Sequence, residues 1–274
     1  MNKGSTILRH IILLLFLLFT AYPLVWMSLC AFRTEGDAQA NPLALPKTWT
    51  LSNLANVFRD GNFASAYLNS LALCVISVAI AVVVATLAAF AFSQMRFCGR
   101  GLIFALFILG MLLPIHVTLI PLNQLLGNGG LHLKGSLASL VGPYVAFALP
   151  ISILILKNGF DALPRDLMDA ACLDGCGPWG ILFNVAIPLI RPSLATVCIF
   201  NFLTMWNEYA FALTLLGPGV RTLPLALQDF KGEHDIMITQ TSAALLLVII
   251  PLVIVYLFAQ KQIIRGLTAG AIKE

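Results

Sequence analysis

The sequence predicts an all-α integral membrane protein with about six transmembrane helices. Of its 274 residues, 59% are hydrophobic and only 10% are charged, whereas a soluble domain carries roughly 25% charged residues. Six apolar segments are also long enough to cross a bilayer, which takes about 20 mainly apolar residues. Because these segments are spread over nearly the whole chain, residues 1–274 are predicted to form a single membrane domain.

The predicted spans are separated by polar stretches that contain glycine or proline. They cover residues 11–32, 67–92, 102–126, 136–156, 193–216 and 241–260. Lys3 and Arg9 precede the first span, as they would in a signal peptide. This apolar run is longer than the roughly 7–15 residues of a signal peptide, and no small-residue cleavage site follows it. We therefore expect an uncleaved first helix.

The distribution of basic residues predicts the orientation. With the N-terminus in the cytoplasm, segments 1–10, 93–101, 157–192 and 261–274 face inward and carry ten Lys and Arg residues, against six in the outward segments. Cytoplasmic loops are enriched in basic residues. We expect a multi-pass protein of the cytoplasmic (inner) membrane with both termini in the cytoplasm.

Two of the predicted spans contain residues that disturb a helix. The third has Pro114 and Pro121, and the fourth has Gly142-Pro143 and Pro150. Proline removes a backbone donor and kinks a helix, and membranes tolerate the freed carbonyls only where neighbouring helices or a cavity satisfy them. The kinks could be ordinary, or they could mark a solute path along spans three to five.

The longest predicted inward segment, 157–192, reads as two short helices joined at a glycine. Pro164 suits a first helical position, and Gly175 suits the left-handed turn that ends a helix. A second helix is expected from about Pro178 to Ala186, with Pro188 and Pro192 breaking it before span five. The small residues of this loop would let another protein approach closely; the alternative is a surface helix pair without a partner.

The motif in this loop resembles the EAA loop of bacterial ABC importer permeases. It consists of Asp169-Ala-Ala-x-x-Asp174-Gly175, followed by Ile187-Pro188 and Pro192. Asp169 stands where that family usually has Glu, and Cys176 where it often has Ala. In the family this loop docks on an ATP-hydrolysing subunit. The resemblance thus implies ATPase-docking roles for Asp169, Ala170, Ala171, Asp174, Gly175 and Pro188.

Other stretches resemble the carbohydrate branch of that family, in particular the subunit similar to the second maltose permease. They include Trp49–Asn53, Trp206-Asn207-Glu208 and the tail Arg265–Lys273, and the similarity covers essentially the whole chain. The resemblance implies import of a sugar or sugar-like solute. The implied partners are two ATP-binding cassette ATPase subunits, a second homologous permease subunit, and an extracytoplasmic solute-binding protein that contacts the loop 33–66. The tail would reach the ATPase dimer interface through Arg265, Gly266, Gly270 and Lys273.

Polar residues within the predicted spans are candidates for a translocation path. Glu208 lies in span five beside Asn207, and an acidic group at depth should face the bundle interior or water. His116 and Asn123 lie seven residues apart on span three and share a helical face. Each could line the path. Each could instead make a structural hydrogen bond to another helix.

Motifs that the sequence lacks exclude several classes of function. There is no G-x-x-x-x-G-K-[ST] phosphate loop and no hydrolase or zinc-protease motif, so we expect no enzyme activity and no bound cofactor, with ATP used by a partner. The six cysteines form no metal-ligand pattern, and we expect them to be small packing residues, with no metal site. The basic residues fit membrane orientation rather than nucleic acid. The alternative is a secondary transporter driven by an ion gradient.

Overall fold

The structure is a computed structural model. It describes residues 3–59, 61–127, 130–229 and 237–271, with side chains for residues 6–59, 62–127, 130–228 and 237–258. Within these ranges the chain is helical, and its sole β-type pairing is an isolated bridge between Gly135 and Leu216. The chain divides into two compact units. The predicted all-α class is confirmed.

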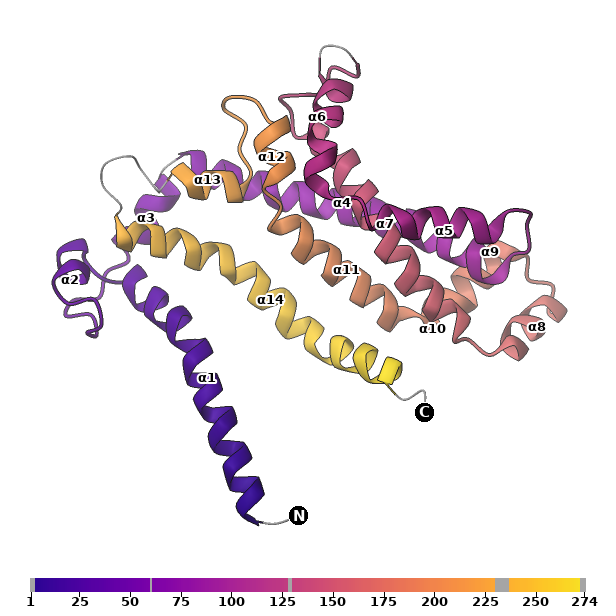
Figure 1. Ribbon diagram of the computed structural model, residues 1–274, viewed down its shortest axis with the longest axis horizontal. Helices are drawn as coiled ribbons and strands as arrows, with labels where there is room; N and C mark the ends of the chain where they lie inside the picture. The colour runs from indigo at the N-terminus through magenta and orange to yellow at the C-terminus, as the bar shows by residue number, and fades with distance from the viewer. Residues whose placement is uncertain (1–2, 60, 128–129, 230–236, 272–274) are drawn as a thin grey trace. The chain divides into compact units, whose positions relative to one another are not determined.

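The first unit comprises Met1–Ser65 and Leu225–Pro251. The long helix α1 and two short helices make up most of its N-terminal part, and the first turns of α4 and the start of α14 belong to it as well (Figure 1). The bounds are α1 Lys3–Ala31, α2 Glu35–Ala40, α3 Ser52–Arg59, α13 Leu223–Asp229 and α14 Ile238–Ala271.

The second unit comprises Ala66–Pro224 and Leu252–Glu274. Within it α7 and α11 pack alongside each other (Figure 1). The bounds of its helices are α4 Gly61–Gln94, α5 Arg100–Gly110, α6 Ile115–Leu126, α7 Ala138–Asp161, α8 Arg165–Leu173, α9 Pro178–Gly180, the π-helix η1 Ile181–Ala186, α10 Ile187–Leu189, α11 Arg191–Trp206 and α12 Ala210–Leu215.

Four helical segments are long and apolar enough to cross a membrane: Thr6–Ala31, Asn62–Gln94, Ala138–Asp161 and Ile238–Phe258. Two further pairs of helices qualify if each bent pair is one span, which gives up to six among the described residues. The predicted number of spans is thereby confirmed. Pro143 and Pro150 lie inside the continuous helix α7, so neither residue breaks the fourth span.

The third span is not the single rod that the sequence predicted. The two helices α5 and α6 meet at an angle of 99°. The break falls at Met111–Pro114, where Pro114 has extended backbone and cannot continue the preceding helix. Pro121, in contrast, lies inside α6. One of the two predicted breakers therefore breaks the span.

The fifth span also differs from the prediction of 193–216. The helix α11 ends at Trp206, and α12 begins at Ala210. Glu208 lies in the gap, where its carboxylate accepts hydrogen bonds from the amides of Phe211 and Ala212 at 2.7 and 3.3 Å. An acidic side chain that binds backbone amides in this way competes with a continuous helix, which explains the break.

The core of the second unit gathers helices that are far apart in the sequence. Side chains of α4, α7, α8, η1 and α11 form one hydrophobic cluster, and the cluster includes Phe90, Phe160, Met168, Leu182 and Val197. Burial of side chains of this size stabilises a fold by about 1.5–3 kcal/mol each. The short helices of the loop 157–192 are thus packed on the same core as the long helices.

The cysteines fulfil the packing expectation only in part. Cys30 and Cys74 are buried, whereas Cys98 and Cys172 are exposed in the chain. The expectation that all six are packing residues is wrong for the two exposed ones, because both lie on segments that connect long helices.

Candidate functional site

The loop after α7 contains the two short helices that the sequence predicted, with different bounds. The helix α7 continues to Asp161, so 157–161 is helix rather than loop. Pro164 has extended backbone and precedes α8 instead of starting it. The second helical stretch runs from α9 through η1 and α10 to Leu189. Its break lies at Ile190, between Pro188 and Pro192, where the chain bends by 77° into α11.

Gly175 ends α8 in the left-handed turn that the sequence predicted, with φ +82°. The amide of Gly175 donates to the carbonyl of Cys172, and the amide of Cys176 donates to the carbonyl of Ala171, both at 3.0 Å. These two bonds are those of a Schellman motif, which satisfies the last carbonyls of a helix. The chain can therefore reverse at an exposed position without leaving these carbonyls unpaired.

The structure divides the predicted docking residues into two groups. Asp169, Ala170, Asp174 and Gly175 are exposed, as a docking surface requires. Ala171, 8% exposed, belongs to the hydrophobic core. Pro188 is half-buried on α10. Ala171 and Pro188 thus hold the loop in place from within, and the other four are available for contact.

Two large apolar side chains on the same loop were missed from the sequence. Leu173 is 89% exposed at the end of α8, and Trp179 is 63% exposed on α9. The Trp179 ring stacks on Phe183, with centroids 6.1 Å apart. Exposed apolar side chains of this size are typical of a protein interface. Their position in the sequence could have revealed them, because both lie next to turn residues, where polar side chains are usual.

The two ends of the loop meet at a close contact between α7 and α11. A Cβ placed on Gly159 would lie 2.7 Å from Oγ and 3.1 Å from Cβ of Ser193. A second link joins α7 to α4, because the Ser93 hydroxyl donates to the Asp161 carboxylate at 2.6 Å. The loop between residues 162 and 190 therefore emerges from a closed stem rather than from two independent helix ends.

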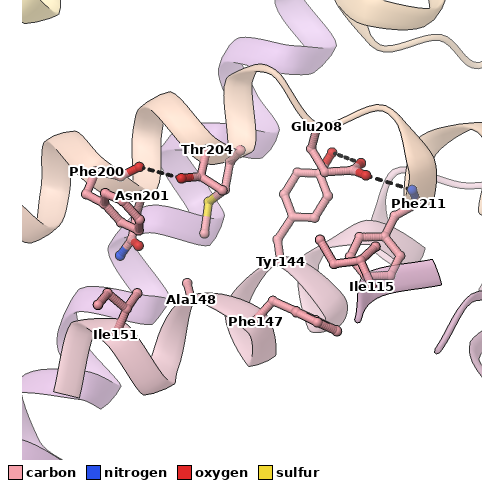
Figure 2. A pocket seen from close by; sticks show the side chains of 11 residues that line it. Ile115, Tyr144, Phe147, Ala148, Ile151, Phe200, Asn201, Thr204, Glu208 and Phe211 are labelled. Carbon is pink, nitrogen blue, oxygen red and sulfur yellow. Dashed lines mark hydrogen bonds between the residues drawn. The ribbon is translucent and has the colours of Figure 1, made fainter. Parts of the chain in front are cut away.

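A pocket opens between α6, α7, α11 and α12 in the second unit. Its enclosed volume is about 60 Å³, and Figure 2 shows the lining side chains. Aromatic rings of Tyr144, Phe147, Phe200 and Phe211 line it together with the polar side chains of Asn201, Thr204 and Glu208. The pocket lies along the predicted third to fifth spans, where the sequence analysis left a solute path open.

The polar groups of this pocket are hydrogen-bonded. Tyr144 Oη donates to Glu208 at 2.9 Å, and Figure 2 shows this bond beside the one from the Phe211 amide. Deeper in the packing, Asn201 Nδ2 donates to Ser152 Oγ at 2.9 Å and joins α11 to α7. Glu208 combines the two alternatives drawn from the sequence, since it bonds another helix and also lines the pocket.

The other candidate path residues lie elsewhere. Asn207 is exposed and donates to the Leu203 carbonyl on its own helix at 2.8 Å. His116 is exposed and Asn123 half-buried on α6. None of the three lines the pocket, although Ile115, next to His116, does. The structure thus does not bring the four predicted path residues together.

The predicted tail residues lie at the end of the chain. Arg265, Gly266 and Gly270 belong to α14, whose helical backbone continues to Ala271. This helix extends well past residue 260, where the sixth span was predicted to end. Lys273 lies outside the described residues.

Residues 77–269 match the family model for the binding-protein-dependent transport system inner membrane component. The putative ABC transporter permease protein ORF2 of Caldicellulosiruptor is 38% identical over 265 residues, which are 96% of this chain and 95% of that protein. The diacetylchitobiose uptake permease NgcG of Streptomyces coelicolor is 30% identical, with 99% of this chain and 90% of that protein covered. The sulfoquinovosyl glycerol transport permease SmoH of Agrobacterium fabrum is 33% identical, with 97% and 93% covered.

Solved structures give the same fold. A chain of a bacterial ABC transporter involved in the import of the acidic polysaccharide alginate matches with a TM-score of 0.82 at 23% identity, covering 95% of this chain and 98% of that one. A chain from the alginate transporter in complex with its pentasaccharide-bound periplasmic protein matches with a TM-score of 0.71 at 15% identity, covering 94% and 93%. The protein therefore belongs to the inner membrane components of binding-protein-dependent transport systems, the permeases of ABC importers.

Proposed function

We propose that this chain is a permease subunit that carries a sugar or sugar-like solute across the cytoplasmic membrane, driven by ATP hydrolysis on a partner. The observation that carries the proposal is the exposed reversal after α8, which is packed on one core with α4, α7 and α11. A force applied to such a loop reaches the spans through tightly packed side chains, and packed interiors transmit displacement.

In the proposed mechanism, two ATP-binding cassette subunits close on ATP and move α8. Asp169, Ala170, Asp174 and Gly175 form the contact, together with Leu173 and Trp179. The closed stem at Gly159 and Ser193 passes the movement to α7 and α11, which line the pocket. Binding of a solute shifts such an equilibrium only by its difference in affinity for the inward- and outward-facing states.

A sugar is the proposed solute because of the lining of the pocket. Aromatic faces of Phe147, Phe200 and Phe211 suit the apolar faces of a sugar ring, and Asn201, Thr204 and Glu208 supply hydrogen-bonding groups. Relatives named for diacetylchitobiose and sulfoquinovosyl glycerol support this solute class. We infer a second permease subunit on the far side of the path, an extracytoplasmic solute-binding protein, and cytoplasmic termini.

The test is reconstitution. The chain is purified with a C-terminal affinity tag from its native host, and associated proteins are identified. We expect an ATPase and a second permease to co-purify. In proteoliposomes, uptake of radiolabelled solute should require ATP and the binding protein. Uptake that continues without ATP but stops when the ion gradient is abolished would replace the proposal with secondary transport.

The same assay tests individual residues. Deleting residues 266–274 should abolish uptake, because we propose that the tail contacts the ATPase dimer. Glu208→Ala should reduce uptake at an unchanged membrane level, because it removes the acceptor of Tyr144 and the cap of α12. Normal uptake by either variant would remove that residue or segment from the mechanism.

A further inference from the structure

The segment Asn41–Leu51, which follows α2, exposes large apolar side chains. Leu43, Leu45, Trp49 and Leu51 are 79, 73, 66 and 67% exposed, respectively. A water-exposed loop with four such side chains in eleven residues is unusual, because contiguous apolar surface marks contact with protein or membrane. What covers this segment follows from its position along α1.

The segment folds back along the C-terminal turns of α1. The Trp26 indole nitrogen donates to the Pro42 carbonyl at 2.7 Å. Trp49 lies in a groove with side chains of α1 from Leu24 to Leu29 and with Phe32, the residue after the end of α1. Since a helix rises 1.5 Å per residue, Trp26 lies about 8 Å before the last residue of α1, Ala31. The segment is thus level with the end of a membrane-spanning helix rather than beyond it.

Backbone groups in and before the segment are satisfied by one buried arginine. Arg33 is 1% exposed. Its Nη2 donates to the carbonyls of Asp37 and Asn41, both at 2.8 Å, and its Nε donates to the Asp37 carboxylate at 3.0 Å. The guanidinium holds the pKa of Asp37 below its ordinary value, so the carboxylate stays charged at neutral pH.

Main-chain bonds complete this arrangement. The amide of Ala44 donates to the carbonyl of Asn41, and that of Thr50 donates to the carbonyl of Phe32, the residue after the end of α1. The amide of Lys47 donates to the Asp37 carboxylate at 3.3 Å. Such pairing lets irregular backbone lie next to lipid, where less water is available to satisfy its polar groups.

We propose that Asn41–Leu51 is a lipid anchor that inserts into the interfacial layer of the bilayer beside the C-terminal end of α1. Leu43 and Leu45 contact acyl chains, and Trp49 lies at the level where tryptophan is enriched in membrane proteins. The exposed Lys47 extends to lipid phosphate, as lysine does at an interface. We choose lipid as the occupant because the segment packs on the end of α1, a membrane-spanning helix whose apolar window no other described part of this chain buries.

The test measures what surrounds residue 45 in the assembled transporter. Leu45→Cys is spin-labelled in a chain whose Cys98, Cys172, Cys176 and Cys198 are replaced by serine, with cysteine-free partner subunits. The complex is reconstituted in phosphatidylethanolamine and phosphatidylglycerol vesicles. Collision rates are then measured with oxygen, which concentrates in lipid, and with a neutral nickel chelate, which stays in water.

Two reference positions calibrate the result. Leu14→Cys on the exposed surface of α1 gives the lipid value, and Asn56→Cys on the exposed face of α3 gives the water value. The anchor predicts high oxygen and low nickel access at residue 45, matching residue 14. High nickel access would overturn it in favour of a solvated loop. Low access to both reagents would overturn it in favour of a protein contact, with the binding protein or the second permease.

Because the measurement needs neither solute nor ATP, its failure and the failure of the proposed transport function are distinguishable. A second variant keeps the outcome interpretable. Leu43→Cys, on the other side of Ala44, should give the same collision profile. A lipid profile at one of the two positions and a water profile at the other would refute insertion of the segment as a unit.

Discussion

Two irregular segments of this protein solve the same problem by opposite means. Residues 162–190 and residues 33–51 each reverse the chain next to a long helix, and each must satisfy the backbone groups that a helix end leaves unpaired. The first segment does so with main-chain bonds centred on Gly175, and it emerges where Gly159 of α7 approaches Ser193 of α11. The second adds to a few main-chain bonds one charged side chain, Arg33, which bonds two carbonyls and a carboxylate.

The difference predicts where each segment is vulnerable. A turn made from main-chain bonds tolerates changes of its exposed side chains better than it tolerates a Cβ at a glycine that has positive φ or a close neighbour, such as Gly175 or Gly159. A turn organised by one guanidinium tolerates substitution of its exposed side chains but not loss of the guanidinium. For transport, the first solution leaves the docking surface free to match a partner, whereas the second fixes a segment that carries no exposed charge except Lys47.

The largest effect is expected for Arg33→Met. The substitution removes the guanidinium from the Asp37 carboxylate and from the carbonyls of Asp37 and Asn41, which each keep one backbone amide donor. Loss of a hydrogen bond to a charged group costs about 1.5–3 kcal/mol. We expect a clearly lower melting temperature of the detergent-purified complex and a reduced membrane level. Thermal unfolding followed by size-exclusion chromatography measures both.

Arg59→Met is the matched control, because Arg59 is exposed on α3, and it should melt as the wild type does. Arg33→Met combined with Asp37→Leu should recover part of the loss, since an apolar pair avoids a buried unpaired charge. A melting temperature unchanged by Arg33→Met would show that this arginine does not organise the segment.

The second prediction concerns the stem of the other segment. Gly159→Ala brings a Cβ to 2.7 Å from Ser193 Oγ, and overpacking of this kind costs about 1–3 kcal/mol. Part of this destabilisation is offset, because alanine is more favourable than glycine within a helix by about 1 kcal/mol. We expect a moderate loss of stability and a larger loss in the number of solute molecules imported per ATP hydrolysed.

Gly142→Ala controls for the gain in helix propensity, because it lies on the same helix and its Cβ would meet nothing within 4 Å. Ser193→Ala, which removes the closer of the two atoms, should partly restore coupling in the double variant. If Gly159→Ala and Gly142→Ala import equally well per ATP, the stem does not transmit force.

The sequence predicted the features that arise from local chemistry. The helical class, the number of spans and the left-handed Gly175 follow from apolar length and from the backbone freedom of glycine, and the structure confirms them. The break of span three at Pro114 could also have been predicted, because proline disturbs a helix through its own local chemistry.

Features that depend on distant residues could not be predicted. Glu208 breaks span five because its carboxylate binds amides ahead of it and Tyr144 on another helix, a partner 64 positions away. The exposure of Leu173 and the burial of Ala171 depend on which face of α8 meets η1, and the motif does not encode that choice. Nor does the sequence reveal that Gly159 touches Ser193.

The smallest effect is expected at the turn that the sequence predicted best. Gly175→Ala forces an alanine into the left-handed region, at a cost of about 1 kcal/mol, and no neighbouring atom lies within 4 Å to add a clash. Stability should fall slightly. Stimulation of ATP hydrolysis by the binding protein should fall more, because the turn sets the direction in which Asp174 and Leu173 are presented.

Gly177→Ala is the control, since Gly177 has φ −73° and a Cβ there would also meet nothing within 4 Å. Gly175→Asn should lie between the two, because asparagine tolerates the left-handed region better than alanine. Equal stimulation in all three variants would mean that the docking surface adjusts to its partner. The turn after α8 would then differ from the segment 33–51, which depends on Arg33 for its conformation.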